Sequence, residues 1–444
     1  MPRVPPLRWV LVLVLAGAAG IHADDWPHWR GPSTTGVAAS STALPATWSA
    51  TSNVAWQVPL EGAGVSSPIV SGARVFVTSQ AGDGRRRDGR HPTLTQAGDP
   101  AEAGEVTLQR RTKRDTVAFV VEAFDRTSGK RAWIHETPAE GDLPPVHDKH
   151  NLASASPVTD GERVYAWYGT GQIVALDAAS GKRVWTKHLG KEYGAFDIQW
   201  GHASSPVLYQ DSLILLCYHN PASYLLALDR RTGAVKWKAD KPAGQESYSS
   251  PIVVQGPAGA ELIVNSNSGV ESFDPNTGRS LWTYPEVNRF PIPVAMVDNG
   301  MLFLSRGYRS SPYMAIRLGG RGDITATHVA WRVPTGGPYV SSLVHYQGVI
   351  YMSTDNGILS AADAKNGERL WQERVGGTFS ASPIAGDGKI YFVSEGGETI
   401  VIKAGRTFEL VARNKLDGHF VASPAAGGGK VFLRADDRLY AVGR

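Results

Sequence analysis

The chain has 444 residues, of which 42% are hydrophobic and 19% are charged, and its formal net charge at pH 7 is +4. This balance is typical of a globular protein and gives no indication of a nucleic-acid or membrane-surface partner. Cys217 is the only cysteine, so no internal disulfide can form. Its apolar neighbours indicate a buried thiol rather than a reactive one.

Residues 1–23 have the pattern of a secretory signal peptide. Arg3 and Arg8 come before an apolar run of 13 residues from Trp9 to Ile21. A membrane-spanning helix needs about 20 apolar residues, so the pattern predicts cleavage and export without a transmembrane segment. We therefore expect an exported protein that is periplasmic or extracellular.

Residues 24–52 connect this signal to the rest of the chain. They begin with DDWPHWRGP and continue as a connector rich in Ser, Thr and Ala. Trp26 and Trp29, three residues apart, make the segment too apolar for a free tail. We expect it to dock on the domain that follows.

From residue 53 onward the chain repeats one pattern with a period of roughly 40 to 50 residues. Each copy opens with a short strand, followed by a β-branched and aromatic run and a phrase like ALDAxxGxxxW. Tight-turn signals such as Asp160-Gly161 and Asn299-Gly300 separate the strands, which is typical of an antiparallel meander. The opening strands start near Ser67, Ser156, Ser205, Ser250, Ser382 and Ser423, with Ala295 and Leu343 at the equivalent place in two further copies. These eight copies predict an all-β, eight-bladed propeller of four-stranded blades over residues 53–444.

The last copy lacks its outer strand. From about Phe420 to the C-terminus only three strands can be recognised, and no tryptophan ends the copy. The stretch 53–58, NVAWQV, has the missing outer-strand pattern. We predict that it completes the last blade, because this closure removes an open sheet edge that would promote aggregation.

Two recurrent residue types are interpreted as structural. Tryptophans end the outer strands at Trp56, Trp133, Trp185, Trp237, Trp282, Trp331 and Trp371, and their large rings are suited to packing between blades. Carboxylates recur at one position, just before a turn, as Asp125, Asp177, Asp229, Asp274 and Asp363. An aspartate there accepts hydrogen bonds from the turn amides, so these residues are not read as a catalytic set.

Residues 81–115 form the one long irregular insertion, which falls in the first blade. It contains two basic clusters, at 85–87 and 110–114, among several acidic residues. One interpretation is a solvated, partly disordered loop. The other is a docking surface for an acidic protein partner or an anionic polysaccharide, because long loops on rigid scaffolds often bind.

The segments before the second and third Ser-Pro strands carry candidate site residues. His147 and His150 lie in the first, and Asp197, Trp200 and His202 lie in the second. Because inner strands line the channel of a propeller, we expect these residues to gather at one mouth. The histidines together with an acidic neighbour could ligate a metal, but their spacing matches no dedicated zinc pattern. No metal site is predicted, and hydrogen-bonding histidines are the favoured interpretation.

Equivalent positions in the other blades add aromatic candidates. Counting back from the Ser-Pro strands places Tyr339, Phe379 and Phe420 at the same point as His202. A concave, partly aromatic rim with a few polar groups is a typical place for a ligand. The alternative is that these rings plug the channel. The predicted ligand-binding set is His147, His150, Asp197, Trp200, His202, Tyr339, Phe379 and Phe420.

Several phrases resemble the secreted family of pyrroloquinoline-quinone-like (PQQ-like) β-propeller repeat proteins. They are WPHWRGP, LPATWS, NVAWQVPL and the repeated Ser-Pro, Asp-Gly and ALDAxxGxxxW phrases. The family includes quinoprotein dehydrogenases and the outer-membrane assembly lipoprotein of the β-barrel machinery. The resemblance therefore implies the propeller fold and either a scaffold or an oxidoreductase.

The same resemblance implies what a quinoprotein would need. Its dehydrogenases hold the quinone between a tryptophan and a disulfide of adjacent cysteines, next to a calcium ion. Cys217 has no neighbouring cysteine, so that half of the clamp cannot form. The lipid-bearing cysteine of the assembly lipoprotein is also missing, because no cysteine follows the apolar run.

We therefore expect a monomeric, secreted propeller scaffold without catalysis or cofactor. It would bind a protein partner, a polysaccharide or a small ligand at the channel mouth. The alternative is a dehydrogenase that uses PQQ and calcium to oxidise an alcohol or sugar, with Trp200 as platform, Asp197 as base and His202 nearby. A third possibility is a carbohydrate-associated protein whose aromatic rim stacks on sugar rings.

Overall fold

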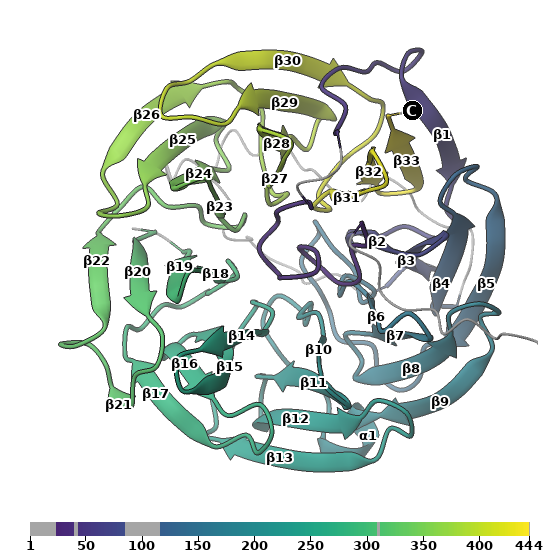
Figure 1. Ribbon diagram of the computed structural model, residues 1–444. Helices are drawn as coiled ribbons and strands as arrows, with labels where there is room; N and C mark the ends of the chain where they lie inside the picture. Colours follow the sequence, from purple (N-terminus) through teal and green to yellow (C-terminus); the bar gives the residue numbers. More distant parts are fainter. Residues whose placement is uncertain (1–23, 40–42, 85–115, 309–310, 444) are drawn as a thin grey trace, which may run out of the picture.

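Eight small sheets form a ring around a central channel (Figure 1). The computed structural model describes residues 24–39, 43–84, 116–308 and 311–443. Within these residues the chain forms strands β1 to β33 and one short helix, α1 (Leu189–Tyr193). The prediction of an all-β, eight-bladed propeller is confirmed. The predicted signal peptide and the basic clusters of the insertion lie outside the described residues.

Each blade is an antiparallel meander that starts at the channel and ends at the rim. Blade one comprises β2 (Ile69–Ser71), β3 (Arg74–Ala81), β4 (Ala118–Asp125) and β5 (Arg131–Pro138), and blade two comprises β6 (Val158–Thr159), β7 (Arg163–Trp167), β8 (Gln172–Asp177) and β9 (Arg183–His188). Blade three comprises β10 (Val207–Tyr209), β11 (Ser212–Cys217), β12 (Ser223–Asp229) and β13 (Val235–Lys241), and blade four comprises β14 (Ile252–Gly256), β15 (Gly259–Ser266), β16 (Gly269–Phe273) and β17 (Ser280–Tyr284).

The second half of the ring follows the same plan. Blade five comprises β18 (Met296–Asp298), β19 (Met301–Ser305), β20 (Tyr313–Arg317) and β22 (Val329–Val333), and blade six comprises β23 (Val344–Tyr346), β24 (Val349–Ser353), β25 (Ile358–Asp363) and β26 (Arg369–Arg374). Blade seven comprises β27 (Ile384–Gly386), β28 (Lys389–Val393), β29 (Glu398–Lys403) and β30 (Leu410–Lys415), and blade eight comprises β31 (Ala425–Gly427), β32 (Lys430–Ala435), β33 (Arg438–Val442) and β1 (Val54–Pro59).

The N-terminal strand closes the ring, as predicted. Strand β1 pairs antiparallel with β33, with Trp56 opposite Ala441 and Val58 opposite Leu439. The two strands come from opposite ends of the chain and lie side by side in Figure 1. The outer edge of β33 is therefore hydrogen-bonded rather than left open.

One short strand was not predicted. Strand β21 (Gly322–Asp323) pairs parallel with β17, so blade four has a fifth strand. The strand belongs to the connection between β20 and β22, and the amide of Ile324 donates to the carbonyl oxygen of Thr283 at 3.0 Å. The blade period in the sequence carries no signal for such a long-range pairing.

The hydrophobic core is divided into layers between neighbouring blades. Ile69 and Phe76 of blade one, for example, pack against Val164 and Val174 of blade two. A blade is a single sheet covered on both faces, so its middle strands are buried on both sides. Strand β4 shows this, because seven of its eight residues are buried, among them Glu122.

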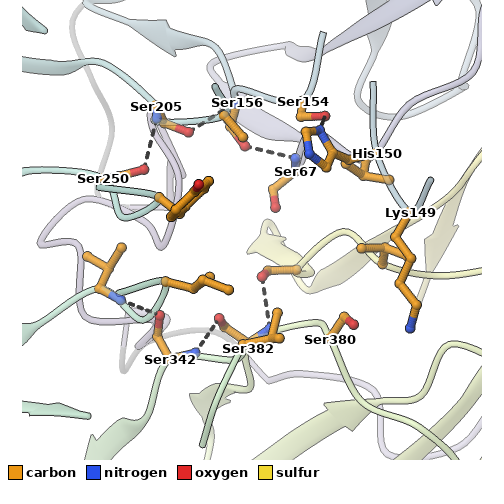
Figure 2. A pocket seen from close by; sticks show the side chains of 18 of the residues that line it. Ser67, Lys149, His150, Ser154, Ser156, Ser205, Ser250, Ser342, Ser380 and Ser382 are labelled. Atoms are coloured by element: carbon orange, nitrogen blue, oxygen red, sulfur yellow. Dashed lines mark hydrogen bonds between the residues drawn. The ribbon is translucent and has the colours of Figure 1, made fainter. Parts of the chain in front are cut away.

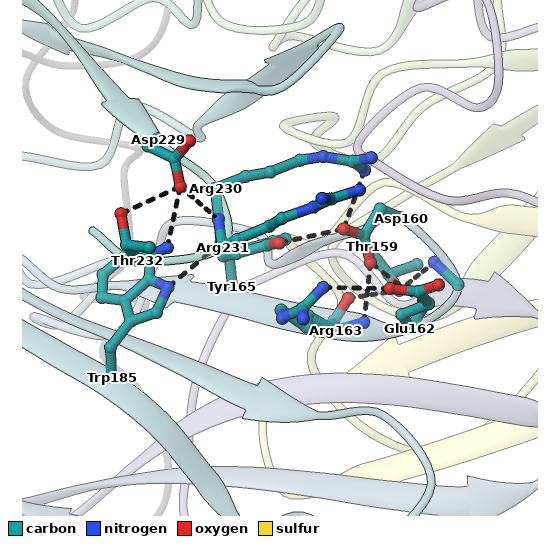
Figure 3. Close-up of polar contacts among 11 residues, drawn as sticks. Thr159, Asp160, Glu162, Arg163, Tyr165, Trp185, Asp229, Arg230, Arg231 and Thr232 are labelled. Carbon is teal, nitrogen blue, oxygen red and sulfur yellow. Dashed lines mark hydrogen bonds and ion pairs between the residues drawn. The ribbon is translucent and has the colours of Figure 1, made fainter. Parts of the chain in front are cut away.

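Outer tryptophans link neighbouring blades at five junctions, where the indole of Trp56, Trp133, Trp185, Trp237 or Trp331 donates to a backbone carbonyl oxygen of the next blade. Trp185 of blade two donates from Nε1 to the carbonyl oxygen of Arg230 in blade three at 3.1 Å (Figure 3). The turn itself is held by Asp229, whose Oδ1 accepts the amide of Thr232 at 2.9 Å. Gly233 follows with φ of 74°, and a Cβ there would lie 2.9 Å from the indole of Trp185. The structural interpretation of these aspartates and tryptophans is confirmed at this blade junction.

The segment 24–39 crosses the centre of the ring (dark purple in Figure 1). Trp26 is 1% exposed and exchanges two backbone hydrogen bonds of 2.8 Å with Val70 of β2. The amide of Ala38 donates to Ala385 of β27 at 2.8 Å. The segment therefore spans from blade one to blade seven.

No helix in the described part of the chain is long and apolar enough to span a membrane.

Candidate ligand-binding cup

The channel contains a cavity of about 240 Å³, here called the cup. Trp29 of the N-terminal segment lines the cup, and the neighbouring Arg30 fixes this segment to the channel wall. Arg30 is 2% exposed and donates from Nη2 to the carbonyl oxygens of Leu343 at 2.7 Å and Thr35 at 2.9 Å. Since the segment crosses the ring beside inner strands, it obstructs one end of the channel.

A ring of serines forms the wall of the cup (Figure 2). One serine comes from the start of the inner strand in seven of the eight blades: Ser67, Ser156, Ser205, Ser250, Ser342, Ser382 and Ser423. Five of these serines donate their amide to the hydroxyl oxygen of the serine in the next blade, as from Ser67 to Ser156 at 2.9 Å and from Ser382 to Ser423 at 3.0 Å. Blade five has Val294 instead, whose amide donates to Ser342 at 2.9 Å.

This serine ring explains part of the repeated sequence pattern. Four of its hydrogen bonds join serines that each precede a proline, for example Ser156 to Ser205 at 3.0 Å and Ser205 to Ser250 at 2.8 Å. Proline has no amide hydrogen, so the serine amide and hydroxyl supply the polar link between adjacent blades. The sequence showed the recurrence of serine but not that these side chains meet around one cavity.

Four of the predicted site residues line the cup: His147, His150, Trp200 and Tyr339. The Nε2 atom of His150 lies 2.6 Å from the carbonyl oxygen of Trp200, and Nδ1 lies 3.2 Å from Oγ of Ser154. Burial lowers the pKa of His150 to about 4, so the ring is neutral at pH 7. The ring of His147 lies edge-on to that of Trp200, with 5.6 Å between centroids. That these residues bind a ligand stays a prediction.

The other four predicted residues do not line the cup. His202 is 3% exposed, its Nε2 lies 3.0 Å from the carbonyl oxygen of Leu216, and burial lowers its pKa to about 3. Phe379 and Phe420 are 0% and 1% exposed and belong to cores between blades. Asp197 is exposed, and its backbone pairs with that of Asn220. The predicted enzyme set of Trp200, Asp197 and His202 is therefore not assembled at the cup.

The alternation of an extended segment accounts for part of this arrangement. Side chains of such a segment point alternately to opposite sides. The cup is lined by the ring serine and by the residue two positions before it, as with Ser382 and Ser380. His202, Phe379 and Phe420 lie three positions before a ring serine and do not line the cup, whereas Tyr339, at the same offset from Ser342, does. The offset from the serine therefore does not decide by itself whether a side chain faces the cup.

A buried ionic network beside the cup was missed by sequence reasoning. Lys149, which lines the cup, lies 3.0 Å from Oε1 and 3.1 Å from Oε2 of Glu395. His419 lies 3.5 Å from Glu395 through Nε2 and 3.0 Å from Asp436 through Nδ1. Ser380, another cup residue, donates its hydroxyl to Glu395. Inside the protein, Lys149 is thus paired with Glu395, and His419 is paired with Asp436.

A repeated signal could have located this network. Asp355, Glu395 and Asp436 each lie four residues after the aromatic residue of the second strand in blades six, seven and eight. Asp355 is 1% exposed, and burial raises its pKa to about 8, so it is mainly protonated at pH 7. Acidic residues at one buried position of three consecutive blades indicate a shared polar environment.

The network predicts a pH-dependent stability. Burial disfavours a charged His419, but the hydrogen bond to Asp436 and the interaction with Glu395 outweigh it and raise the pKa of His419 to about 9. A raised folded-state pKa stabilises the fold fully below the unfolded value near 6.5, and this contribution is lost as the pH rises to about 9. Its size is on the order of 3 kcal/mol. We expect the unfolding midpoint of the protein to fall across this range.

The measurement is chemical denaturation of the protein and of His419→Gln between pH 6 and pH 10. The unchanged protein should exceed His419→Gln in free energy of unfolding by the largest amount near pH 6. At pH 10 the two proteins should be almost equally stable. His328→Gln is the matched control, because His328 hydrogen-bonds only near the surface, to Thr327 at 2.8 Å. A difference for His419→Gln that stays constant with pH would contradict the charged state of His419.

The residues of the cup do not fit a quinone with calcium. No carboxylate and no cysteine belongs to the described residues that line it. Cys217 is a free, fully buried residue of β11, and burial raises the pKa of its thiol. No group of three or more His, Cys, Asp or Glu side chains in the described ranges is arranged to hold a metal ion. The calcium ligands and the disulfide clamp of quinoprotein dehydrogenases thus have no counterpart there.

Comparison with family models identifies the kind of propeller. The model of the outer membrane protein assembly factor BamB, a family of PQQ-like repeats, matches residues 117–290 and 266–403. The chain belongs to this BamB-like, PQQ-like propeller family. The resemblance inferred from the repeated phrases is thereby confirmed.

Curated relatives of this BamB-like chain have different activities. It is 27% identical over 293 residues to tetrathionate hydrolase of Acidithiobacillus ferrooxidans, covering 61% of this chain and 53% of the relative. It is 24% identical over 289 residues to BamB of Yersinia pestis, and the match covers 64% of this chain and 59% of that protein. The chain thus spans between half and three fifths of the length of these relatives. A match to 1-butanol dehydrogenase (quinone) of Thauera butanivorans is 30% identical but covers only 28% of this chain and 21% of the enzyme.

Solved structures show the same fold. The europium-containing methanol dehydrogenase matches with a TM-score of 0.65 at 12% identity, covering 93% of this chain and 90% of that chain. BamB from Moraxella catarrhalis matches with a TM-score of 0.54 at 14% identity, covering 74% and 94%. Both an assembly factor and an enzyme are therefore built on this propeller, and function has to be argued from the cup.

Proposed function

We propose that this BamB-like chain is an exported, non-catalytic propeller that binds a small ligand in the cup. The observation that carries the proposal is the composition of the cup wall: a ring of serine hydroxyls, aromatic side chains and no carboxylate among the described lining residues. Such a concave site with a few convergent polar groups is suited to recognition.

The titratable residues of the cup are arranged for structure rather than for proton transfer. A general base needs a free nitrogen or oxygen within reach of the substrate and a pKa near the working pH. His150 has hydrogen-bond partners at both ring nitrogens and a pKa of about 4. Its neighbour Ser154 donates its hydroxyl to the carbonyl oxygen of Asn151. Lys149 is held by Glu395. His150 and Lys149 are thus both engaged in contacts within the protein rather than poised as a free acid or base.

The competing function is a quinone-dependent dehydrogenase, which the matches to quinoproteins favour. Against it stands the donor set of the cup, which lacks the carboxylates that calcium requires. A hydrolase of sulfur oxyanions is suggested by the match to tetrathionate hydrolase, although that match covers only 53% of the relative.

The test combines binding with turnover on the purified chain without residues 1–23. We would titrate it with pyrroloquinoline quinone plus calcium, with tetrathionate and with glucose, following tryptophan fluorescence, because Trp29 and Trp200 line the cup. The proposal expects saturable binding of at least one small probe, lost in Ala203→Phe, which fills the cup. It expects no dye reduction with alcohols or sugars and no hydrolysis of tetrathionate. Dye reduction or hydrolysis at enzymatic rates would overturn it.

A further inference from the structure

The hydroxyl protons of the serine ring have no acceptor within the described protein. A serine hydroxyl has one hydrogen to donate and two lone pairs to accept with. In the ring, six hydroxyl oxygens accept an amide from the neighbouring blade, as Ser250 does from Ser205 at 2.8 Å. None of the seven hydroxyls donates a hydrogen bond to another described residue. The cup wall therefore carries seven hydroxyl protons that a bound acceptor could take up.

Ser67 is the most informative member of the ring. It is 3% exposed and lines the cup, and its hydroxyl neither donates to nor accepts from any described residue. A buried hydroxyl without a partner is destabilising unless a water or ligand satisfies it. Figure 2 shows this hydroxyl pointing toward the open space between the two halves of the ring. The geometry thus leaves one position where a ligand atom would complete a hydrogen bond.

Lys149 adds a further hydrogen-bond donor to the cup. It is the one cationic Lys or Arg side chain among the described lining residues, and its charge is balanced by Glu395, which does not itself line the cup. Its ammonium group has three hydrogens, while Glu395 offers only two carboxylate oxygens, at 3.0 and 3.1 Å. One hydrogen is left to donate. Lys149 and the ring hydroxyls would thus donate to the same ligand.

We propose that the ligand of the cup is a small oxyanion, a carboxylate or sulfate-like group, held by the hydroxyl protons of the serine ring together with Lys149. This inference rests on the proposed function, because it requires that the cup binds a ligand. Oxyanions carry only acceptors, so one oxyanion can take up several of the hydroxyl protons that the ring leaves without an acceptor.

The experiment is isothermal titration of the purified chain without residues 1–23 at constant ionic strength set by sodium chloride. Sodium sulfate and sodium succinate are the oxyanion probes, and glucose and choline chloride are the neutral and cationic controls. We expect saturable binding of at least one oxyanion with one site per chain, and none of glucose or choline.

Two substitutions locate the bound oxyanion. Ser67→Ala should weaken its affinity about tenfold without changing the unfolding temperature, because the hydroxyl makes no bond within the described protein. Lys149→Met should weaken it at least as much. Ser180→Ala is the matched control, because the hydroxyl of Ser180 donates to Asp177 in an exposed outer turn. The affinity of this variant for the oxyanion should be unchanged.

The outcomes separate this inference from the proposed function. Binding of glucose that is lost in Ala203→Phe would overturn the oxyanion inference and leave a ligand-binding cup. Oxyanion binding that is unchanged in Ser67→Ala and Lys149→Met would place the anion elsewhere and also overturn it. Absence of binding by every oxyanion up to about 1 mM, the upper end of typical KM values, would also overturn the oxyanion inference. Dye reduction with alcohols would overturn the proposed function itself.

Discussion

Replacing Arg434 by alanine is expected to lower the free energy of unfolding by about 3 to 5 kcal/mol. Arg434 lies in β32 of blade eight and is 1% exposed. Its Nη1 donates to the carbonyl oxygens of Ser66, at 3.0 Å, and of Thr78 in blade one, and its Nη2 donates to Oγ of Ser79 at 2.8 Å. The side chain thus links the last blade to the first. Alanine would leave buried acceptors unpaired and create a cavity.

Urea denaturation of the two proteins measures this effect. Arg413→Ala is the matched control, because Arg413 lies on the outer strand β30 with 41% of its side chain exposed and pairs with Glu398 at 3.0 Å. A surface pair of this kind contributes no more than about 1 kcal/mol. Equal losses for the two variants would contradict the role assigned to Arg434. Arg434→Lys should recover little of the free energy of unfolding that is lost in Arg434→Ala, since a single ammonium group cannot reproduce the planar fork of a guanidinium.

Removal of residues 24–59 is expected to have the largest effect on the fold. The truncated chain lacks β1, so the edge of β33 becomes exposed. It also loses Trp56, which is 8% exposed and donates from Nε1 to Arg126 of blade one at 3.1 Å. Burial of one such tryptophan contributes about 3 to 5 kcal/mol. We expect an unfolding temperature lower by roughly 10 °C or more and self-association through the open edge.

Addition of a peptide tests the cause of this loss. A synthetic peptide of residues 43–60 contains the whole of β1 and should bind the truncated chain, raise its unfolding temperature and suppress association. A peptide of the same composition in scrambled order is the control. Unchanged stability and monomeric behaviour of the truncated chain would show that β1 is dispensable for closure. Light scattering and thermal denaturation report both properties.

The blade architecture could be predicted because its signals are local. Each blade repeats strand lengths, turn glycines and a terminal tryptophan within about 50 residues. A turn such as 229–233 needs an aspartate to accept amides and a glycine at positive φ, and both are visible in the sequence. The closing strand β1 was predicted for the same reason, because the last blade lacked one recognisable piece.

The candidate site could be predicted only in part. His147, His150, Trp200 and Tyr339 line the cup. His202, Phe379 and Phe420 do not, although they occupy the same repeat position as Tyr339. The direction of each side chain depends on how its segment enters the channel, which a repeat alignment does not specify.

By itself, the sequence determined the repeat, the number of blades, the closing strand and the absence of a disulfide clamp. Only the tertiary structure decided that the serines form one ring, that residues 24–39 obstruct the channel, and that Lys149 meets Glu395, a residue 246 positions away. The physical reason is one of range. Strands and turns follow from interactions between neighbouring residues, whereas the centre of a propeller is made of single positions from every blade, brought together only when the ring closes.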